Sequence, residues 1–141
     1  MREIYGAAFL ATFLVLLFCI IKTGKSTKKI RTTVRSTLMV AEVSVLANSI
    51  TVLSQNLTVC LIAYSVFFVS IGWLLFCVLR FVKEYTGIHS HWKTVQMILG
   101  GVLTIDSISL LLNTWLGHAF ACKSHPFEDG IYYYVAGKIP Y

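Results

Sequence analysis

Four long apolar runs occupy most of this 141-residue chain and constrain its fold more than any other feature. The runs cover residues 4–21, 37–54, 57–81 and 95–116. The hydrocarbon core of a bilayer is about 30 Å thick, and about 20 apolar residues in an α-helix are needed to cross it. Because unpaired backbone amides are costly in hydrocarbon, such runs must be helical. The sequence therefore predicts an all-α integral membrane helical bundle with four transmembrane helices, surrounded by the lipid bilayer.

The positions of the basic residues predict how these helices are oriented. The chain is 57% hydrophobic and 13% charged, with a formal net charge of +6. Nine of its twelve Lys and Arg residues lie in or beside the connectors 22–36 and 82–93, whereas the connector at 55–56 has no charge. Cytoplasmic connectors carry an excess of Lys and Arg. We therefore expect 22–36 and 82–93 in the cytoplasm, the N-terminus outside, and no nucleic-acid partner.

The segment 117–141 differs in composition from the four runs. It contains both prolines of the chain and the run Tyr132-Tyr133-Tyr134. This mixture predicts an ordered outer loop with a short hairpin around residues 128–130. An even number of crossings places both termini outside, and we expect the chain to stop before a fifth helix.

Polar residues within the runs are candidates for a binding site. An ionised carboxylate at mid-membrane costs about 2.5–3.5 kcal/mol, so the presence of Asp106 within a predicted span indicates a structural or functional role. Ser109 and Asn113 follow it at i+3 and i+7 and share its helix face. Asn48 belongs to a similar stripe in the second run and reaches about the same depth as Asp106. We expect the two stripes to face each other across a polar interior; the alternative is interhelical hydrogen bonding of about 0.6 kcal/mol per contact.

A second acid predicts an ion pair near the cytoplasmic side. Glu42 lies about 9 Å along the second predicted helix, and Arg80 closes the third on the same side. The long Arg80 side chain can reach inward, so a Glu42–Arg80 pair could lock the two helices together. The alternative is that Glu42 extends towards water.

The cysteines and histidines predict little chemistry. Cys60 and Cys122 both fall on the outer side, and they are either a disulfide or two small buried side chains. His118, Cys122 and His125 have ligand-like spacing, but a flexible loop is a weak metal signal, and we predict no metal. The sequence contains no nucleophile–base set and no phosphate-binding loop, so we expect no cofactor and no enzyme activity in this chain.

The residues that carry a family resemblance lie in the last two runs and the segment after them. They are Trp73-Leu74-Leu75-Phe76, Arg80-Phe81, Glu84-Tyr85-Thr86-Gly87, Asp106, Leu110-Leu111-Leu112-Asn113, His118, Phe120, Tyr134 and Pro140-Tyr141. With these motifs the chain resembles the first four helices of the N-terminal seven-transmembrane sensor region of bacterial histidine kinases and GGDEF diguanylate cyclases. The resemblance implies the bacterial inner membrane, part of a seven-helix bundle, and a homodimer.

The resemblance also implies a function. The chain would be the sensory input module of a signal-transduction protein and would transmit an extracytoplasmic or intramembrane signal by helix repacking. Asn48, Asp106, Asn113 and His118 are then candidates to contact an unknown small-molecule ligand in the polar interior. The main alternative is a small transporter or channel component with Glu42 and Asp106 on an ion or proton path, and an inert membrane subunit comes third.

Overall fold

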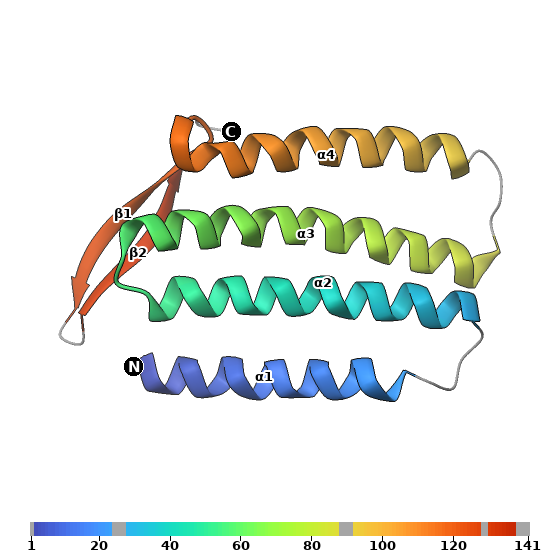
Figure 1. Cartoon of the computed structure of the whole chain (residues 1–141), viewed down its shortest axis with the longest axis horizontal. Helices are drawn as coiled ribbons and strands as arrows, with labels where there is room; N and C mark the ends of the chain where they lie inside the picture. The colour runs from blue at the N-terminus through green and yellow to red at the C-terminus, as the bar shows by residue number, and fades with distance from the viewer. Residues whose placement is uncertain (1, 24–27, 88–91, 128–129, 138–141) are drawn as a thin grey trace.

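Four long helices followed by a two-stranded hairpin make up the chain (Figure 1). A computed structural model describes residues 2–23, 28–87, 92–127 and 130–137. Its elements are α1 (Arg2–Lys22), α2 (Lys28–Leu53), α3 (Leu57–Thr86), α4 (Trp92–Leu116), β1 (Phe120–Phe127) and β2 (Gly130–Gly137). All four helices are long and apolar enough to cross a membrane. The predicted all-α fold with four membrane-spanning helices is therefore confirmed.

The helix ends follow local backbone chemistry. α2 begins at Lys28, well before the apolar run at 37–54, because Lys and Arg are good helix formers and a helix can continue beyond the hydrocarbon. The side chain of Asn56 caps α3 by accepting hydrogen bonds from the backbone N–H of Thr58 and Val59. α3 ends at Gly87, whose φ of 69° is the left-handed conformation that suits glycine.

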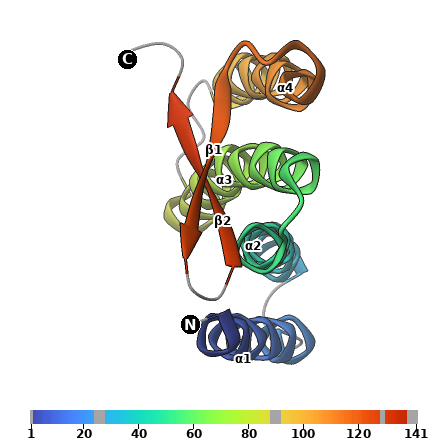
Figure 2. The same ribbon diagram turned by 90° about the vertical axis from the view of Figure 1, so that its left-hand side faces the viewer.

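The helices lie side by side in an open row, in chain order (Figures 1 and 2). α2 packs on α1 and α3, and α3 packs on α2 and α4. One end of the row holds the 55–56 connector and the hairpin, and we call it the hairpin end. The other holds the ends of α1 and α3 and the starts of α2 and α4, and we call it the basic end after its Lys and Arg residues.

Small side chains form the seam between α2 and α3. The buried residues Ala47 on α2 and Cys60 and Ala63 on α3 are small, which lets the two helices approach closely. In the middle of this seam the Ser44 hydroxyl donates to the Ser70 hydroxyl at 2.9 Å. The seam is therefore packed from small and polar groups, as expected where lipid already solvates apolar surface.

The seam between α3 and α4 also depends on one small residue. A Cβ added at Gly72 would lie 3.2 Å from a methyl group of Leu103, so glycine permits close contact there. One residue further along α3, Trp73 Nε1 donates to the Ser107 hydroxyl at 3.0 Å. α4 is thus held to α3 by close packing and a hydrogen bond near mid-helix.

The segment after α4 forms an antiparallel hairpin, as its composition predicted. Phe120 pairs with Gly137 and Phe127 with Gly130, so the two strands are paired from end to end. Residues 128–129 between the strands, and Pro140-Tyr141, lie outside the described residues. Figure 2 shows the hairpin lying across the ends of α2 and α3.

Candidate functional site

Asn113 joins the end of α4 to the start of the hairpin. Its side chain is 1% exposed. Its Nδ2 donates to the Phe120 carbonyl at 3.0 Å, and its Oδ1 accepts from the backbone N–H of Ala119 at 2.7 Å and of Phe120 at 3.3 Å. Gly117 makes the turn in between with a φ of 57°. The predicted site residue Asn113 therefore fixes where β1 leaves the membrane helix.

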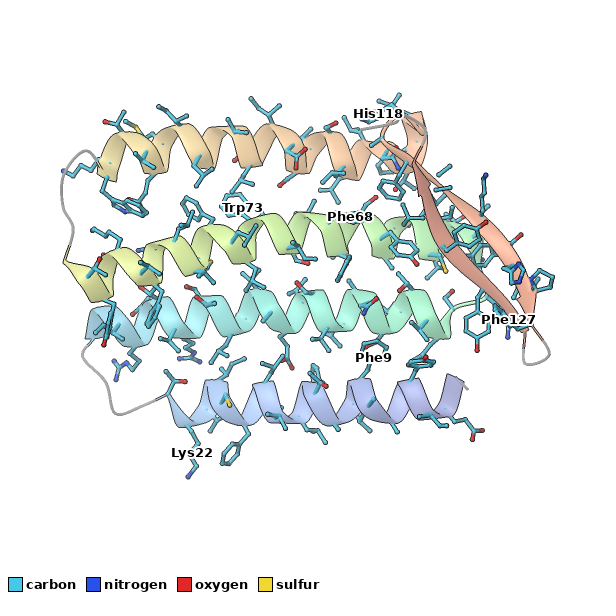
Figure 3. All side chains as sticks on the ribbon, turned by 180° about the vertical axis from the view of Figure 1, so that it is seen from behind. Phe9, Lys22, Phe68, Trp73, His118 and Phe127 are labelled. Atoms are coloured by element: carbon cyan, nitrogen blue, oxygen red, sulfur yellow. The ribbon has the colours of Figure 1, made fainter. Side chains whose placement is uncertain are left out.

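His118, which Figure 3 shows beside the end of α4, contacts Ser109 on that helix. The His118 Nε2 and the Ser109 hydroxyl are 2.8 Å apart. Asp106 lies one helical turn before Ser109 and is exposed, without a hydrogen bond or ion pair in the part of the chain that the structure describes. The structure thus places His118 and Asn113 together at the end of α4, whereas the Asp106 side chain is exposed on the helix surface.

The expectation that the Asn48 and Asp106 stripes face each other is wrong. α3 lies between α2 and α4, so the two stripes are on helices that do not adjoin (Figures 1 and 2). Asn48 instead interacts within its own helix, where its carbonyl and Oδ1 accept from the Thr51 hydroxyl at 2.7 and 3.4 Å. The reason for the error is lateral order: equal depth brings two residues together only when their helices are neighbours.

The Glu42–Arg80 pair does not form either. Glu42 is buried, and neither of its carboxylate oxygens has a hydrogen-bond partner among the described residues. Arg80 is exposed on α3. Glu42 is on the side of α2 that faces away from α3, because it is offset by two residues, or about 200°, from Ser44, which bonds to α3. The pair was predicted from depth alone, and the direction of Glu42 rules it out.

Two tyrosines attach the hairpin to the ends of α2 and α3. The Tyr64 hydroxyl on α3 donates to the Tyr133 carbonyl on β2 at 3.0 Å. The Tyr133 hydroxyl donates to the Gln55 carbonyl, in the connector between α2 and α3, at 3.3 Å. Phe120 on β1 adds an edge-to-face contact with Phe68 on α3, with ring centroids 5.4 Å apart. The hairpin is therefore fixed by three contacts, two of them to α3 and one to the connector between α2 and α3.

A cavity of about 260 Å³ lies where the hairpin meets the helices. Its lining includes Leu57 and Leu61 from α3, Asn113 and Thr114 from α4, and Cys122 from β1. Burial, with a smaller effect from Cys60, raises the pKa of the Cys122 thiol to about 11. No disulfide joins Cys60 and Cys122 in the structure, and the Cys122 thiol stays protonated near neutral pH.

The outer part of the hairpin carries a chain of aromatic rings. His125 contacts Phe127 at a centroid distance of 4.8 Å, and Phe127 contacts Tyr132 at 5.3 Å. Phe127 is 53% exposed and Figure 3 shows it near the tip of the hairpin. Aromatic side chains are favoured at the membrane–water interface. His118, Cys122 and His125 do not form a metal-binding group, and no group of three suitable ligands occurs in the described ranges.

Sequence reasoning missed the contacts made by Tyr64, Tyr133 and Trp73. Tyr64 and Tyr133 are 69 residues apart, and no local pattern relates them. The available signal was the presence of Tyr64 and Trp73 within an apolar run, because a buried Tyr or Trp usually finds a hydrogen-bond partner. No family model, curated protein or solved structure matches this chain.

Proposed function

We propose that this chain is the membrane-embedded sensory input module of a bacterial signal-transduction protein, of the histidine kinase or diguanylate cyclase type. The observation that carries the proposal is the attachment of the hairpin. Asn113 ties β1 to α4, Tyr64 ties β2 to α3, and Tyr133 ties β2 to the connector after α2. A displacement of the hairpin would therefore act on α4, on α3 and on the connector between α2 and α3.

The proposed orientation puts the hairpin outside the cell and the basic end in the cytoplasm. It is supported by the connectors: 22–36 and 82–93 hold most of the Lys and Arg residues, and the basic end contains both. This excess of positive charge is typical of cytoplasmic connectors. The protein would then lie in the inner membrane with the hairpin exposed to extracytoplasmic stimuli.

The proposed mechanism is a shift between two packings of the helix row. A stimulus can shift such an equilibrium only if it binds one packing better than the other. The small-residue seams allow modest sliding of neighbouring helices, which is a common form of switching. The transporter alternative has no such support, because Glu42 and Asp106 are on α2 and α4, on either side of α3.

The proposal is tested by uncoupling the hairpin in the living cell. The bacterium that carries the chain would receive Asn113→Ala at the chromosomal locus, with Asn48→Ala as the matched control, and a deletion of the chain. We expect Asn113→Ala and the deletion to change the cellular level of cyclic di-GMP or of a phosphorylated response regulator. Asn48→Ala should leave both levels as in the wild type, because Asn48 bonds only within α2.

The amount of each variant in the membrane fraction is measured by immunoblot, so that loss of the protein is distinguished from loss of coupling. If neither the deletion nor Asn113→Ala alters cyclic di-GMP or regulator phosphorylation, under conditions in which the chain is expressed, the sensory proposal is wrong.

A further inference from the structure

Glu42 is an acidic side chain buried inside the membrane-spanning part of α2. It is 8% exposed, and neither carboxylate oxygen has a hydrogen-bond partner among the described residues. An ionised carboxylate taken out of water without a partner is strongly disfavoured. The proposed motion of the hairpin does not use this residue. Glu42 is therefore a polar group that still requires a partner.

The side of α2 on which Glu42 lies faces α1. Leu46, Ser49 and Leu53 follow Glu42 at i+4, i+7 and i+11, which places all four residues on one helix face. Leu53 lies against α1, because a Cβ added at Gly6 would be 3.5 Å from one of its methyl groups. Glu42 is thus directed towards the α1–α2 interface, away from the seam with α3.

The same interface contains an apolar groove. Its volume is about 360 Å³, and its lining includes Phe9 and Phe13 from α1 and Leu46, Ser49 and Leu53 from α2. Figure 3 shows Phe9 between the two helices. Leu46, the lining residue nearest to Glu42 in the chain, is one helical turn away, or about 6 Å along the axis. Glu42 is not one of the groove's lining residues, but it lies one helical turn beyond Leu46 on the same face of α2.

We propose that the α1–α2 groove binds a lipophilic cation, with an ammonium group at Glu42 and an apolar or aromatic body in the groove. The ammonium gives the buried carboxylate the opposite charge that it lacks. The Phe9 and Phe13 rings fit an aromatic body and interact favourably with a nearby cation. The groove volume suits a small ligand of about ten non-hydrogen atoms.

Binding at this site would act through α1. α1 packs on α2, and no hydrogen bond joins α1 to residues 34–53 of α2 among those that the structure describes. An ammonium that reaches Glu42 must displace α1 slightly, because the carboxylate is covered. This inference rests on the proposed sensory function: the bound cation would be the stimulus, and α1 would be the helix that responds to it.

The site is tested with a matched pair of probes, 4-phenylbutylamine and 4-phenylbutan-1-ol, titrated by calorimetry into the purified chain in phosphatidylcholine nanodiscs. We expect saturable binding of the amine to the wild type and at least tenfold weaker binding of the alcohol. Glu42→Gln should weaken amine binding at least tenfold. The control Asp106→Asn, which removes an acid on a helix that does not adjoin the groove, should leave amine binding unchanged.

A second variant keeps the proposal testable if Glu42→Gln fails to fold. Ser49→Phe fills the groove while retaining Glu42, and it should also weaken amine binding at least tenfold. Equal binding of amine and alcohol, or unchanged amine binding in a folded Glu42→Gln or in Ser49→Phe, would overturn the site. Because binding is measured without any cellular output, failure here is distinguishable from failure of the sensory function, which the Asn113→Ala experiment tests.

Discussion

The α1–α2 interface and the hairpin end are held together by different kinds of interaction. At the hairpin end, directed hydrogen bonds from Asn113, Tyr64 and Tyr133 connect the hairpin to its helices. At the α1–α2 interface, apolar side chains surround a groove and an unpartnered Glu42. The first arrangement fixes the hairpin to its helices by directed bonds, whereas the second holds α1 to α2 by apolar contacts.

This difference assigns separate roles to the two regions. Hydrogen bonds fix direction and distance, so the hairpin and α4 move as a unit. Apolar contacts within a membrane are less directional, because lipid tails solvate an apolar helix nearly as well as another helix does. We infer that a signal can enter by displacement of the hairpin or by displacement of α1, and that the α2–α3 seam is where the two effects meet.

The largest expected effect comes from breaking the Asn113 contacts. Asn113→Ala removes three hydrogen bonds to the start of β1, including two to the buried Phe120 backbone, which should destabilise the hairpin by about 3 kcal/mol. Hydrogen exchange at the Ala119 and Phe120 amides measures the loss. Asn48→Ala is the control. Unchanged exchange in Asn113→Ala would show that the hairpin is held by other contacts.

The burial of Cys122 gives the next effect. Its pKa of about 11 lies above the ordinary 9.0, so at pH 8 the folded thiol should react with iodoacetamide about 100-fold more slowly than in denaturant. Because the unfolded thiol ionises first, Cys122 lowers stability as pH rises from about 9 to about 11. Fast alkylation of Cys122 at pH 8 would contradict its placement under the hairpin.

Tyr64→Phe removes one hydroxyl from the hairpin attachment. The lost bond to the Tyr133 carbonyl should cost about 1 kcal/mol and speed exchange of the β2 amides, with little change in α1. Tyr5→Phe on α1 is the matched control, since Tyr5 is 51% exposed. Equal effects of the two substitutions would mean that the hydroxyl of Tyr64 does not connect the hairpin to α3.

The smallest expected effect comes from the hydrogen bond in the seam between α2 and α3. A double-mutant cycle with Ser44→Ala and Ser70→Ala should give a coupling of about 0.6 kcal/mol, the average for an interhelical hydrogen bond in a membrane. Unfolding in mixed micelles with increasing denaturing detergent measures the four stabilities. A coupling near zero would remove the Ser44–Ser70 bond from the account of how α2 and α3 stay in register.

The sequence predicted which segments are helices better than it predicted which helices lie side by side. Apolar length alone identified four spans, because lipid imposes the same requirement on each. The lateral order of helices is not encoded by length or charge, and both pairings inferred from depth, Asn48 with Asp106 and Glu42 with Arg80, proved wrong. Asn113 was predicted as a ligand contact or as part of a polar interior; its three backbone partners depend on the Gly117 turn and could not be foreseen.

The central claim is that directed bonds fix the hairpin to its helices, whereas α1 can shift against α2. The most direct test compares two distances in nanodiscs by double electron–electron resonance. One pair of nitroxides, introduced through ketone-bearing amino acids, replaces the exposed Leu14 on α1 and Val43 on α2, and the other replaces the exposed Ile62 on α3 and Tyr134 on β2. We predict a broader distribution for the first pair, which shifts when 4-phenylbutylamine is added, and a narrow, unmoved distribution for the second. The account would be contradicted if the distance distribution of the α3–β2 pair were as broad as that of the α1–α2 pair. It would also be contradicted if the amine shifted the α3–β2 distance and left the α1–α2 distance fixed.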